Sequence, residues 1–210
     1  MILVGQYDSP YTRRVAIAMH LLEIAFERDT RSVFADAEAM RTINPLGRIP
    51  SLVLDDGEVL IDSAAILDYL DERVGPRRAL VPARGPDRRR ALQIIALASG
   101  TLDKAGAIVY ERTLRPQDKQ DPVWIERCRI QVESGLAALE GITEVGWYVG
   151  GQVSQADITV GCVLAYRGIV ELVRDRFPAL MQKRAVCEAL DAFAITRPAV
   201  DEIMPDGLRQ

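Results

Sequence analysis

The sequence has little of several residue types that common catalytic and metal centres require. Its single histidine, His20, falls inside an apolar helical pattern, where we expect a structural role. The three cysteines, Cys128, Cys162 and Cys187, lie far apart and form no CxxC pair. An odd number of widely spaced cysteines argues against a disulfide framework and against a zinc site, and it fits a reducing cytosol. We therefore expect no bound metal and a cytoplasmic location.

A leader segment and an excess of positive charge are also lacking. The chain begins with four apolar residues, but no basic stretch precedes them and residues 5–8 end the run, so we expect neither a signal peptide nor a membrane span there. The formal net charge is -4 and the pI is about 5.2, which gives no general attraction for nucleic acid or anionic lipid. Arginines cluster at 77–78 and 88–90, a pattern typical of solvated helix faces or linkers.

The first third of the chain alternates between short apolar runs and amphipathic segments. An Asp-Asp-Gly turn at 55–57 between two apolar runs predicts a hairpin. The expected order is strand, helix, strand, helix, hairpin and helix, at residues 1–5, 10–23, 26–33, 35–41, 51–61 and 63–73.

After a segment rich in glycine and proline at 75–86, every pattern is helical. We expect an α/β domain over residues 1–75, a linker over 76–86 and an all-helical domain over 87–210. The third helix of that domain is apolar almost all round, which is typical of the middle of a bundle. Its helices are expected at 87–113, 122–139, 155–173 and 178–194, followed by a short C-terminal helix.

The start of the first helix can stabilise an anion. Ser9 stands at the expected N-cap, with Pro10 at the first helical position. A helix N-terminus has unpaired N–H groups and a partial positive charge, so a thiolate placed there has its pKa lowered from about 8.5 toward neutrality. A shift of two pKa units requires about 2.7 kcal/mol. No base accompanies Ser9, so its hydroxyl is a candidate donor to a substrate sulfur rather than a nucleophile.

Two other segments of the first domain can hold a small polar ligand. A cis Ile49–Pro50 bond before the hairpin would turn the chain and expose the Ile49 N–H and C=O groups. Asp62 and Ser63 begin the next helix and are interpretable as a plain cap. In a binding role, Ser63 and the helix N–H groups would bind a carboxylate while Asp62 pairs with an ammonium group, which together describe a free amino-acid end.

Four segments, taken in order, resemble the cytosolic glutathione transferase superfamily, and the likeness spans nearly the whole chain. Residues 9–14, Ser-Pro-Tyr-Thr-Arg-Arg, are similar to the S-P-[FY]-x-x-[KR] start of serine-type members, such as the plant tau class and related bacterial proteins. Residues 44–50 match N-P-x-G-[KR]-[VI]-P, whose last residue is the cis-proline of the family. Residues 62–70 resemble [ED]-S-x-x-I-x-x-Y-L, and residues 154–157 match the capping box of the second domain, which we interpret as structural.

The resemblance implies a thioredoxin-like N-terminal domain, an all-α helical bundle after it, glutathione as co-substrate and a homodimer. Ser9 would donate a hydrogen bond to the glutathione sulfur. The backbone of Ile49 would pair with the cysteinyl unit, with Pro50 fixing the bend. Asp62 and Ser63 would hold the γ-glutamyl group. Arg48 is a candidate for the glycyl carboxylate, and Asp103 is a candidate to lie near the partner's glutathione.

Two departures from the family pattern bear on the site. Asp62 stands where the family usually has glutamate, which shortens its reach by one methylene. Tyr7 lies two residues before Ser9, and tyrosine-type members use a tyrosine near the end of the first strand. We favour Ser9 as the residue at the sulfur, with Tyr7 as a wall or packing residue.

The expected activity is that of a glutathione transferase, which activates the glutathione thiol for attack on an electrophile. The alternatives are a glutathione-dependent isomerase, dehalogenase or peroxidase, and a non-catalytic binding protein of the same fold. A thiol–disulfide oxidoreductase would need a cysteine at position 9. The second substrate is expected between the domains, where Tyr11, Tyr110 and Tyr166 are candidates to reach it.

Overall fold

The structure is a computed structural model that describes residues 1–173 and 176–202 of the chain. The chain divides into two compact units. Unit 1 contains residues 1–83 together with the described residues from 189 on, and unit 2 contains residues 84–188. The described strands all lie in unit 1, and the described part of unit 2 is helical.

Four short strands form the sheet of unit 1 in the order β2-β1-β3-β4. β1 pairs in parallel with β2 and antiparallel with β3, and β3 and β4 form an antiparallel hairpin. The hairpin predicted from the Asp-Asp-Gly turn is thus confirmed, with the Leu54 N–H donating to the Glu58 carbonyl at 2.8 Å. The strands are β1 (Ile2–Val4), β2 (Glu27–Asp29), β3 (Ser51–Val53) and β4 (Val59–Ile61).

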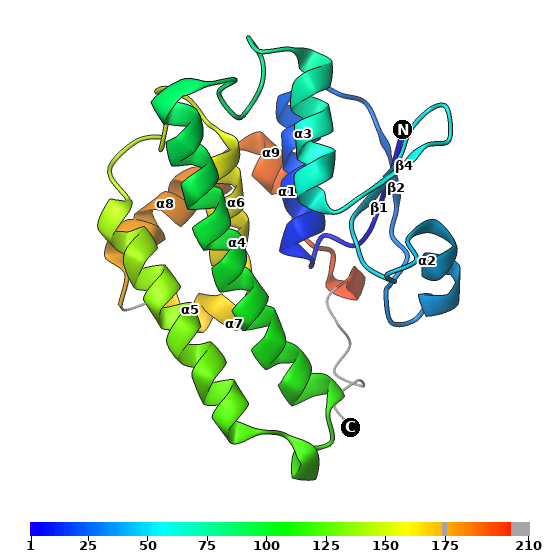
Figure 1. Cartoon of the computed structure of the whole chain (residues 1–210), viewed down its shortest axis with the longest axis vertical. Helices are drawn as coiled ribbons and strands as arrows, with labels where there is room; N and C mark the ends of the chain where they lie inside the picture. Colours follow the sequence, from blue (N-terminus) through cyan, green and yellow to red (C-terminus); the bar gives the residue numbers. More distant parts are fainter. Residues whose placement is uncertain (174–175, 203–210) are drawn as a thin grey trace. The chain divides into compact units, whose positions relative to one another are not determined.

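Alternate strand residues point to opposite faces of the sheet, and helices pack against these faces. Leu3 is paired with Leu52, and both are fully buried in one apolar cluster with residues of α1 and α3. α1 and α3 lie along that face and α2 on the other side of the sheet (Figure 1). The helices of unit 1 are α1 (Pro10–Leu21), α2 (Ala37–Ile43), α3 (Ser63–Val74) and α9 (Asp191–Ile195).

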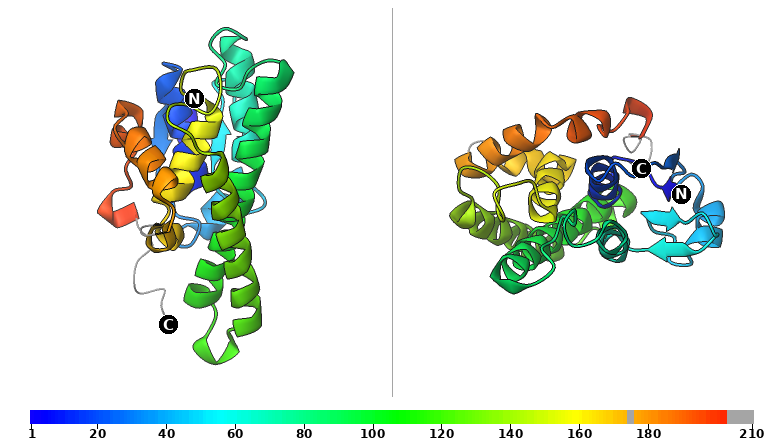
Figure 2. Two further views of the ribbon diagram at one scale, coloured as in Figure 1. Left: turned by 90° about the vertical axis from the view of Figure 1, so that its left-hand side faces the viewer. Right: turned by 90° about the horizontal axis from the view of Figure 1, so that it is seen from above.

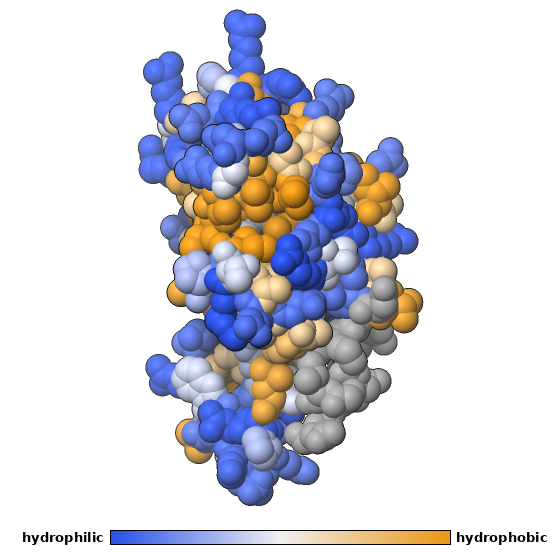
Figure 3. All heavy atoms as spheres, turned by 90° about the vertical axis from the view of Figure 1, so that its right-hand side faces the viewer, coloured by the Kyte–Doolittle hydropathy of each residue, from blue (hydrophilic) through white to orange (hydrophobic). Residues whose placement is uncertain are grey.

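The opposite face of the sheet is partly open. Ile2 pairs with Val53, and Val53 pairs with Val59, so three β-branched side chains form a row across three strands. Ile2 and Val59 are 37% and 38% exposed. Figure 3 looks onto this side of the sheet and shows apolar surface gathered there.

Unit 2 is built around a long helix, α4, that packs against α5 and α6, while α6 also packs against α8 (Figures 1 and 2). A side chain at Gly135 in α5 would meet the Thr101 hydroxyl of α4 at 2.0 Å, so glycine there permits the close approach of the two helices. α6 is buried from Gln155 to Leu164, as its all-round apolar pattern predicts. The helices are α4 (Gly85–Leu114), α5 (Pro122–Ile142), α6 (Gln155–Ala165), α7 (Arg167–Val173) and α8 (Pro178–Glu188), with a short 3-10 turn, η1, at Gln117–Lys119.

Two of the expected helices are each interrupted. The helix expected at 155–173 breaks at Tyr166, whose extended backbone ends α6 and whose carbonyl accepts from the first turn of α7. The helix expected at 178–194 ends at Glu188, and the extended backbone of Leu190 starts α9. Beyond residue 195 the described chain forms only the 3-10 turn η2 (Val200–Glu202), and the remainder of the expected C-terminal helix lies outside the described residues.

The chain returns to unit 1 at its C-terminal end. α9 packs against α1, where the buried guanidinium of Arg13 donates to the carbonyl oxygens of Phe193 and Thr196 at 3.0 and 3.1 Å. η2 is held by an ion pair between Glu202 and Arg28 of β2. Two arginines of the N-terminal segment therefore fix the last described segment of the chain.

α4 is the one helix of the described chain whose length and composition would allow it to cross a membrane, and 28% of its most apolar window is buried. Core helices of soluble proteins meet the same criterion. The packing of α5 and α6 against α4 is that of a helical bundle.

Candidate active site

Ser9 occupies the N-cap of α1, as predicted from the Ser-Pro pair. Its backbone is extended, with φ -76° and ψ 115°, and its Oγ accepts from the Thr12 N–H at 3.4 Å. Pro10 follows at the first helical position, where its missing N–H has no cost. Ser9 is half-buried, so its hydroxyl lies at the rim of unit 1 beside the positive end of the α1 dipole.

Tyr7 has a different environment from Ser9. It is 3% exposed and belongs to the apolar cluster of unit 1. The Arg28 guanidinium stacks on its ring, 3.4 Å from the centroid. Burial raises the pKa of the Tyr7 phenol, and the Arg28 charge opposes that rise only in part. A buried phenol with a raised pKa stays neutral at ordinary pH, which fits the packing role.

Gly5, a residue that the sequence analysis did not single out, brings the start of α1 close to the Ile49 segment. It follows β1 with φ +138°, a conformation that favours glycine. A side chain at Gly5 would meet the Thr12 Oγ1 at 2.6 Å and the Ile49 Cβ at 2.9 Å. The first turn of α1 and the segment before β3 are therefore neighbours. The glycine at position 5, directly after the first apolar run, is the sequence signal that could have indicated this close approach.

The segment before β3 has the form that the resemblance implies. The Ile49–Pro50 peptide bond is cis. Asn44, 2% exposed, holds the preceding turn: its amide donates to the Arg48 carbonyl at 2.8 Å and its side-chain oxygen accepts from the Leu46 N–H at 3.0 Å. Within the described residues, no main-chain hydrogen bond involves Ile49. Its N–H and C=O groups are available to an extended ligand.

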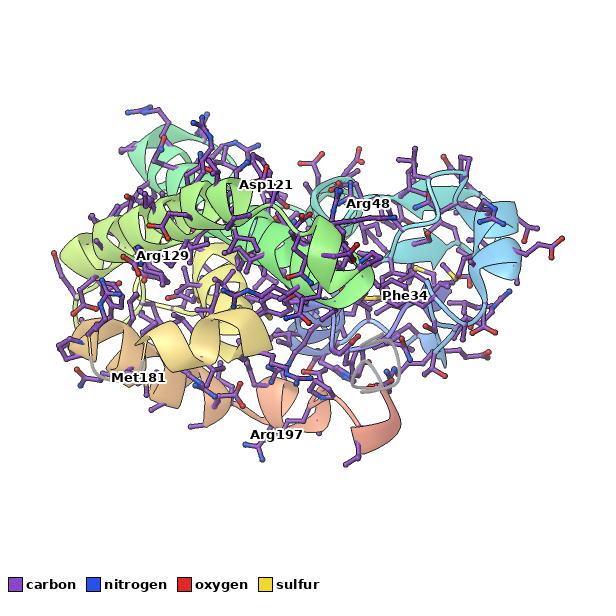
Figure 4. All side chains as sticks on the ribbon, turned by 90° about the horizontal axis from the view of Figure 1, so that it is seen from below. Phe34, Arg48, Asp121, Arg129, Met181 and Arg197 are labelled. Atoms are coloured by element: carbon purple, nitrogen blue, oxygen red, sulfur yellow. The ribbon has the colours of Figure 1, made fainter. Side chains whose placement is uncertain are left out.

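Arg48 precedes this segment with an exposed side chain. Figure 4 labels it together with Phe34, which lies on the connection between β2 and α2. No hydrogen bond or ion pair joins the Arg48 guanidinium to another residue of the described chain. An exposed cation of this kind can pair with an anionic ligand.

Asp62 and Ser63 form the start of α3. The Asp62 carboxylate accepts from the Ala64 N–H at 2.8 Å, so the predicted cap is confirmed. Asp62 also has φ +70°, a conformation that a residue other than glycine rarely adopts and that costs about 1–3 kcal/mol. Such strain is concentrated at ligand clamps, and it marks Asp62 as a functional candidate.

Ser63 is buried and bonded to an arginine of α1. Its Oγ accepts from Arg14 Nε at 3.1 Å and from Arg14 Nη2 at 2.6 Å. The sequence motif contained Arg14 as a basic position, but nothing in its spacing indicated this partner. The bond ties the start of α3 to the helix that Ser9 begins.

The predicted site residues of unit 1 thus lie on three connected segments: the start of α1, the cis-proline segment and the start of α3. The other candidates have ordinary surroundings. Tyr11 is half-buried, with the Arg14 guanidinium 5.5 Å from its ring centroid. Asp103, Tyr110 and Tyr166 belong to unit 2. Among the described residues, no three His, Cys, Asp or Glu side chains are grouped so as to hold a metal ion.

Comparison with known proteins gives matches for both units. Residues 3–78 match the family model of the glutathione S-transferase N-terminal domain, and residues 122–182 match that of the C-terminal domain. An uncharacterized GST-like protein of Escherichia coli K12, YibF, is 31% identical over 79% of this chain and 81% of its own length. The maleylacetoacetate isomerase of Pseudomonas aeruginosa is 29% identical over 95% of this chain and 96% of its own.

Solved structures give the same result. A glutathione S-transferase of Methylobacillus flagellatus with GSH bound superimposes with a TM-score of 0.86 and 34% identity, covering 94% of this chain and 99% of that one. A glutathione transferase family member of Pseudomonas fluorescens with bound glutathione gives 0.82 and 34%, covering 95% and 99%.

A thioredoxin-like sheet domain with a cis-proline, joined to an all-helical domain, defines the class of protein. The chain belongs to the glutathione S-transferase family. The fold class expected from the sequence is confirmed.

Proposed function

We propose that the protein is a glutathione transferase that binds glutathione in unit 1 and activates its thiol for attack on an electrophile. The observation that carries the proposal is the meeting, in one unit, of a serine-capped helix start, a cis-proline segment and the strained start of α3. Relatives of 34% identity have been solved with glutathione bound, which supports the same ligand here.

Each part of the tripeptide has a candidate partner. The γ-glutamyl ammonium group pairs with Asp62, and its carboxylate pairs with Ser63 and the α3 N-terminus. The cysteinyl backbone pairs with Ile49, which Pro50 holds in an extended form. The glycyl carboxylate is a partner for the exposed Arg48. These contacts position the sulfur beside Ser9.

The chemistry then needs little more than a stabilised anion. The glutathione thiol loses its proton to solvent, and the Ser9 hydroxyl and the α1 dipole stabilise the thiolate. The sulfur lone pair forms a bond to the electrophilic carbon, and the leaving group departs with its electron pair or, in an addition, the carbon acceptor is protonated. The protein's contribution is position and charge stabilisation.

Two matched variants test the role of Ser9. Ser9→Ala is expected to raise the pKa of the bound glutathione thiol by about 1–2 units and to lower kcat/KM roughly 10–100-fold, because a hydrogen bond to a charged group is worth about 1.5–3 kcal/mol. Tyr7→Phe removes a hydroxyl two residues away and is expected to leave the thiol pKa unchanged. The measurement is the ultraviolet absorbance of the thiolate during a pH titration. A bound thiol with the pKa of free glutathione in the wild type would contradict the proposal.

A second candidate function is glutathione-dependent isomerisation. The relatives that match nearly the whole chain include maleylacetoacetate isomerases of Pseudomonas aeruginosa and rat, each 29% identical. On the same site the thiolate would add to a carbon–carbon double bond, the resulting single bond would rotate, and elimination would restore the double bond and release the thiolate. Turnover of maleylacetoacetate without loss of glutathione would favour this reaction, and conjugation with a stoichiometric loss would favour the transferase.

The products formed in assays with other substrate classes separate the remaining alternatives. Halide release would indicate a dehalogenase, and formation of glutathione disulfide from a hydroperoxide would indicate a peroxidase. Binding of glutathione without turnover of any substrate class would indicate a non-catalytic protein.

We further propose a cytoplasmic homodimer that binds neither nucleic acid nor membrane. Exposed apolar side chains of α4, with Leu92 43%, Tyr110 50% and Leu114 43% exposed, support a partner surface there. Sedimentation equilibrium is expected to give about twice the chain mass of 23.2 kDa. A monomer at micromolar concentration would contradict the dimer without affecting the glutathione site.

A further inference from the structure

Arg14 and Ser63 form a buried pair between α1 and α3. Arg14 and Ser63 are 4% and 3% exposed. The guanidinium donates two hydrogen bonds to one oxygen, from Nε at 3.1 Å and from Nη2 at 2.6 Å. An arginine usually spreads its donors over two acceptor atoms, as in its pairing with a carboxylate. Here two of them converge on a single serine hydroxyl.

This convergence fixes the direction of the Ser63 hydroxyl. A serine oxygen can accept two hydrogen bonds and donate one. Because both acceptor positions are taken by Arg14, the proton points away from the guanidinium. No residue of the described chain accepts it. Ser63 is therefore a buried donor of fixed direction at the N-terminus of a helix, where an anion is also favoured by the dipole.

We infer that Arg14 is a positioning residue for the γ-glutamyl carboxylate of glutathione, acting through Ser63. The inference rests on the proposed function, because it assigns a further residue to the same glutathione site. Arg14 holds Ser63 as a pure donor before the ligand arrives, so the hydroxyl need not reorient on binding. The effect belongs to binding of the amino-acid end and leaves the sulfur chemistry at Ser9 unchanged.

Arg13 provides a matched control. It is the preceding residue of α1 and is equally buried, at 4% exposed. Its guanidinium donates to the carbonyl oxygens of Phe193 and Thr196, which lie in the C-terminal segment. Replacing Arg13 removes a buried charge of the same kind without touching Ser63.

The test combines these variants with a ligand that lacks one group. Binding of glutathione and of γ-aminobutyryl-cysteinyl-glycine, which lacks only the γ-glutamyl α-carboxylate, is measured by calorimetry for the wild type, Arg14→Met and Arg13→Met. The wild type is expected to prefer glutathione roughly 10–100-fold, the value of a hydrogen bond to a charged group. Arg14→Met is expected to lose most of this preference by weakening glutathione alone, and Arg13→Met to keep it.

Steady-state kinetics supply a second readout. Arg14→Met is expected to raise the KM for glutathione roughly tenfold with kcat nearly unchanged, because the sulfur site is intact. Arg14→Lys, which retains the charge but donates from a single nitrogen, is expected to restore part of the preference and serves if Arg14→Met fails to fold. Ser63→Ala is expected to reproduce Arg14→Met.

Three outcomes would contradict the positioning role of Arg14 or the proposed function. An unchanged preference for the carboxylate in Arg14→Met or Arg14→Lys would overturn the positioning role and leave the glutathione site standing. An equal loss in Arg13→Met would assign the effect to stability of α1 and would also overturn it. A wild type that binds neither ligand would overturn the proposed function itself.

Discussion

Tyr7 and Ser9 are separated by one residue, yet their surroundings differ. Ser9 is half-buried at the start of a helix, whereas Tyr7 is packed in the core under the Arg28 guanidinium. Sequence alone left both residues as candidates for the sulfur, because both lie between β1 and α1. Tyr7 is buried and its phenol pKa is raised, whereas Ser9 is half-buried, and neither property is visible in a residue's type.

At Asp62 we expect stability and ligand binding to respond in opposite directions. Asp62→Gly relieves the strain of φ +70° and is expected to raise the free energy of unfolding by about 1 kcal/mol, since glycine adopts positive φ freely and loses only a few tenths as a cap. The same change removes the carboxylate proposed to meet the ligand's ammonium group, so the KM for glutathione is expected to rise at least tenfold. Urea denaturation and initial rates measure the two effects.

Asp62→Asn is the matched variant, because it keeps an oxygen for the Ala64 N–H but removes the charge. It is expected to raise the KM in the same way without the gain in stability. A gain in stability with unchanged KM for Asp62→Gly would exclude Asp62 from the ligand site.

At the scale of the element, the start of α6 shows how one carboxylate can organise several segments. Asp157 is fully buried and accepts from the Ser154 N–H at 3.0 Å, the Ser154 hydroxyl at 2.7 Å and the Tyr148 N–H at 3.1 Å. It also pairs with the buried Lys183 of α8 at 3.1 Å, and Lys183 donates in addition to the Gly146 carbonyl. The sequence predicted the Ser154–Asp157 capping box, but Lys183 is 26 residues away and its position followed from no local pattern.

Removing the Asp157 charge is expected to cost far more than removing the Ser154 hydroxyl. Asp157→Asn leaves Lys183 buried without its partner and is expected to lower the free energy of unfolding by about 3–5 kcal/mol. Ser154→Ala removes one cap and is expected to cost about 0.5–2 kcal/mol. The double variant Asp157→Asn with Lys183→Met should recover part of the loss. Urea denaturation measures the free energy of unfolding of each variant. Equal losses in Asp157→Asn and Ser154→Ala would show that the ion pair contributes little.

Alkaline pH is expected to destabilise the helical unit through Cys187. Burial raises the pKa of this thiol to about 12, and the nearby Asp157 charge acts in the same direction. The unfolded chain ionises its thiol near pH 8.5, so the contribution to stability is complete below that pH and is lost as the pH rises toward 12. Cys187→Ala is therefore expected to show a smaller fall in unfolding free energy between pH 8 and pH 11 than the wild type.

A truncation without a titrating group provides the control for Cys187. Val163→Ala removes a fully buried side chain of α6 and is expected to lower the free energy of unfolding by a similar amount at both pH values. If the pH dependence of Cys187→Ala matched that of the wild type, another group would have to account for alkaline unfolding.

At the scale of the whole molecule, local patterns predicted the order of elements but not the points where the chain changes direction inside apolar stretches. Tyr166 and Leu190, where the two breaks fall, are neither glycine nor proline, and apolar residues continue on both sides of each break. The residues proposed for the glutathione site were accessible to sequence reasoning because each is a turn or cap with its own local chemistry. Gly5, Arg14 and Lys183 were not, since their roles depend on partners distant in the sequence.

The C-terminal segment returns to unit 1 and packs against α1, so it is a partner of α1 that is distant in the sequence. Phe193 is fully buried, and its carbonyl accepts from Arg13, whose guanidinium also lies 5.3 Å from the centre of its ring. Phe193→Ala is expected to cost about 3–5 kcal/mol and to speed amide hydrogen exchange along α1, because α1 loses its cover. Ile195→Ala, in the same helix but 60% exposed, should change stability by less than about 0.5 kcal/mol.

Hydrogen exchange read by mass spectrometry distinguishes this dependence from a general loss of stability. If the C-terminal segment supports α1, peptides of residues 10–21 in Phe193→Ala should exchange faster than those of α5 under conditions where the protein remains folded. Glutathione affinity should fall with them, because Ser9 and Arg14 stand on the helix that has been loosened. Equal acceleration in α1 and α5 would show instead that the molecule opens as one cooperative unit, and that the last described segment has no special role in holding the sulfur site.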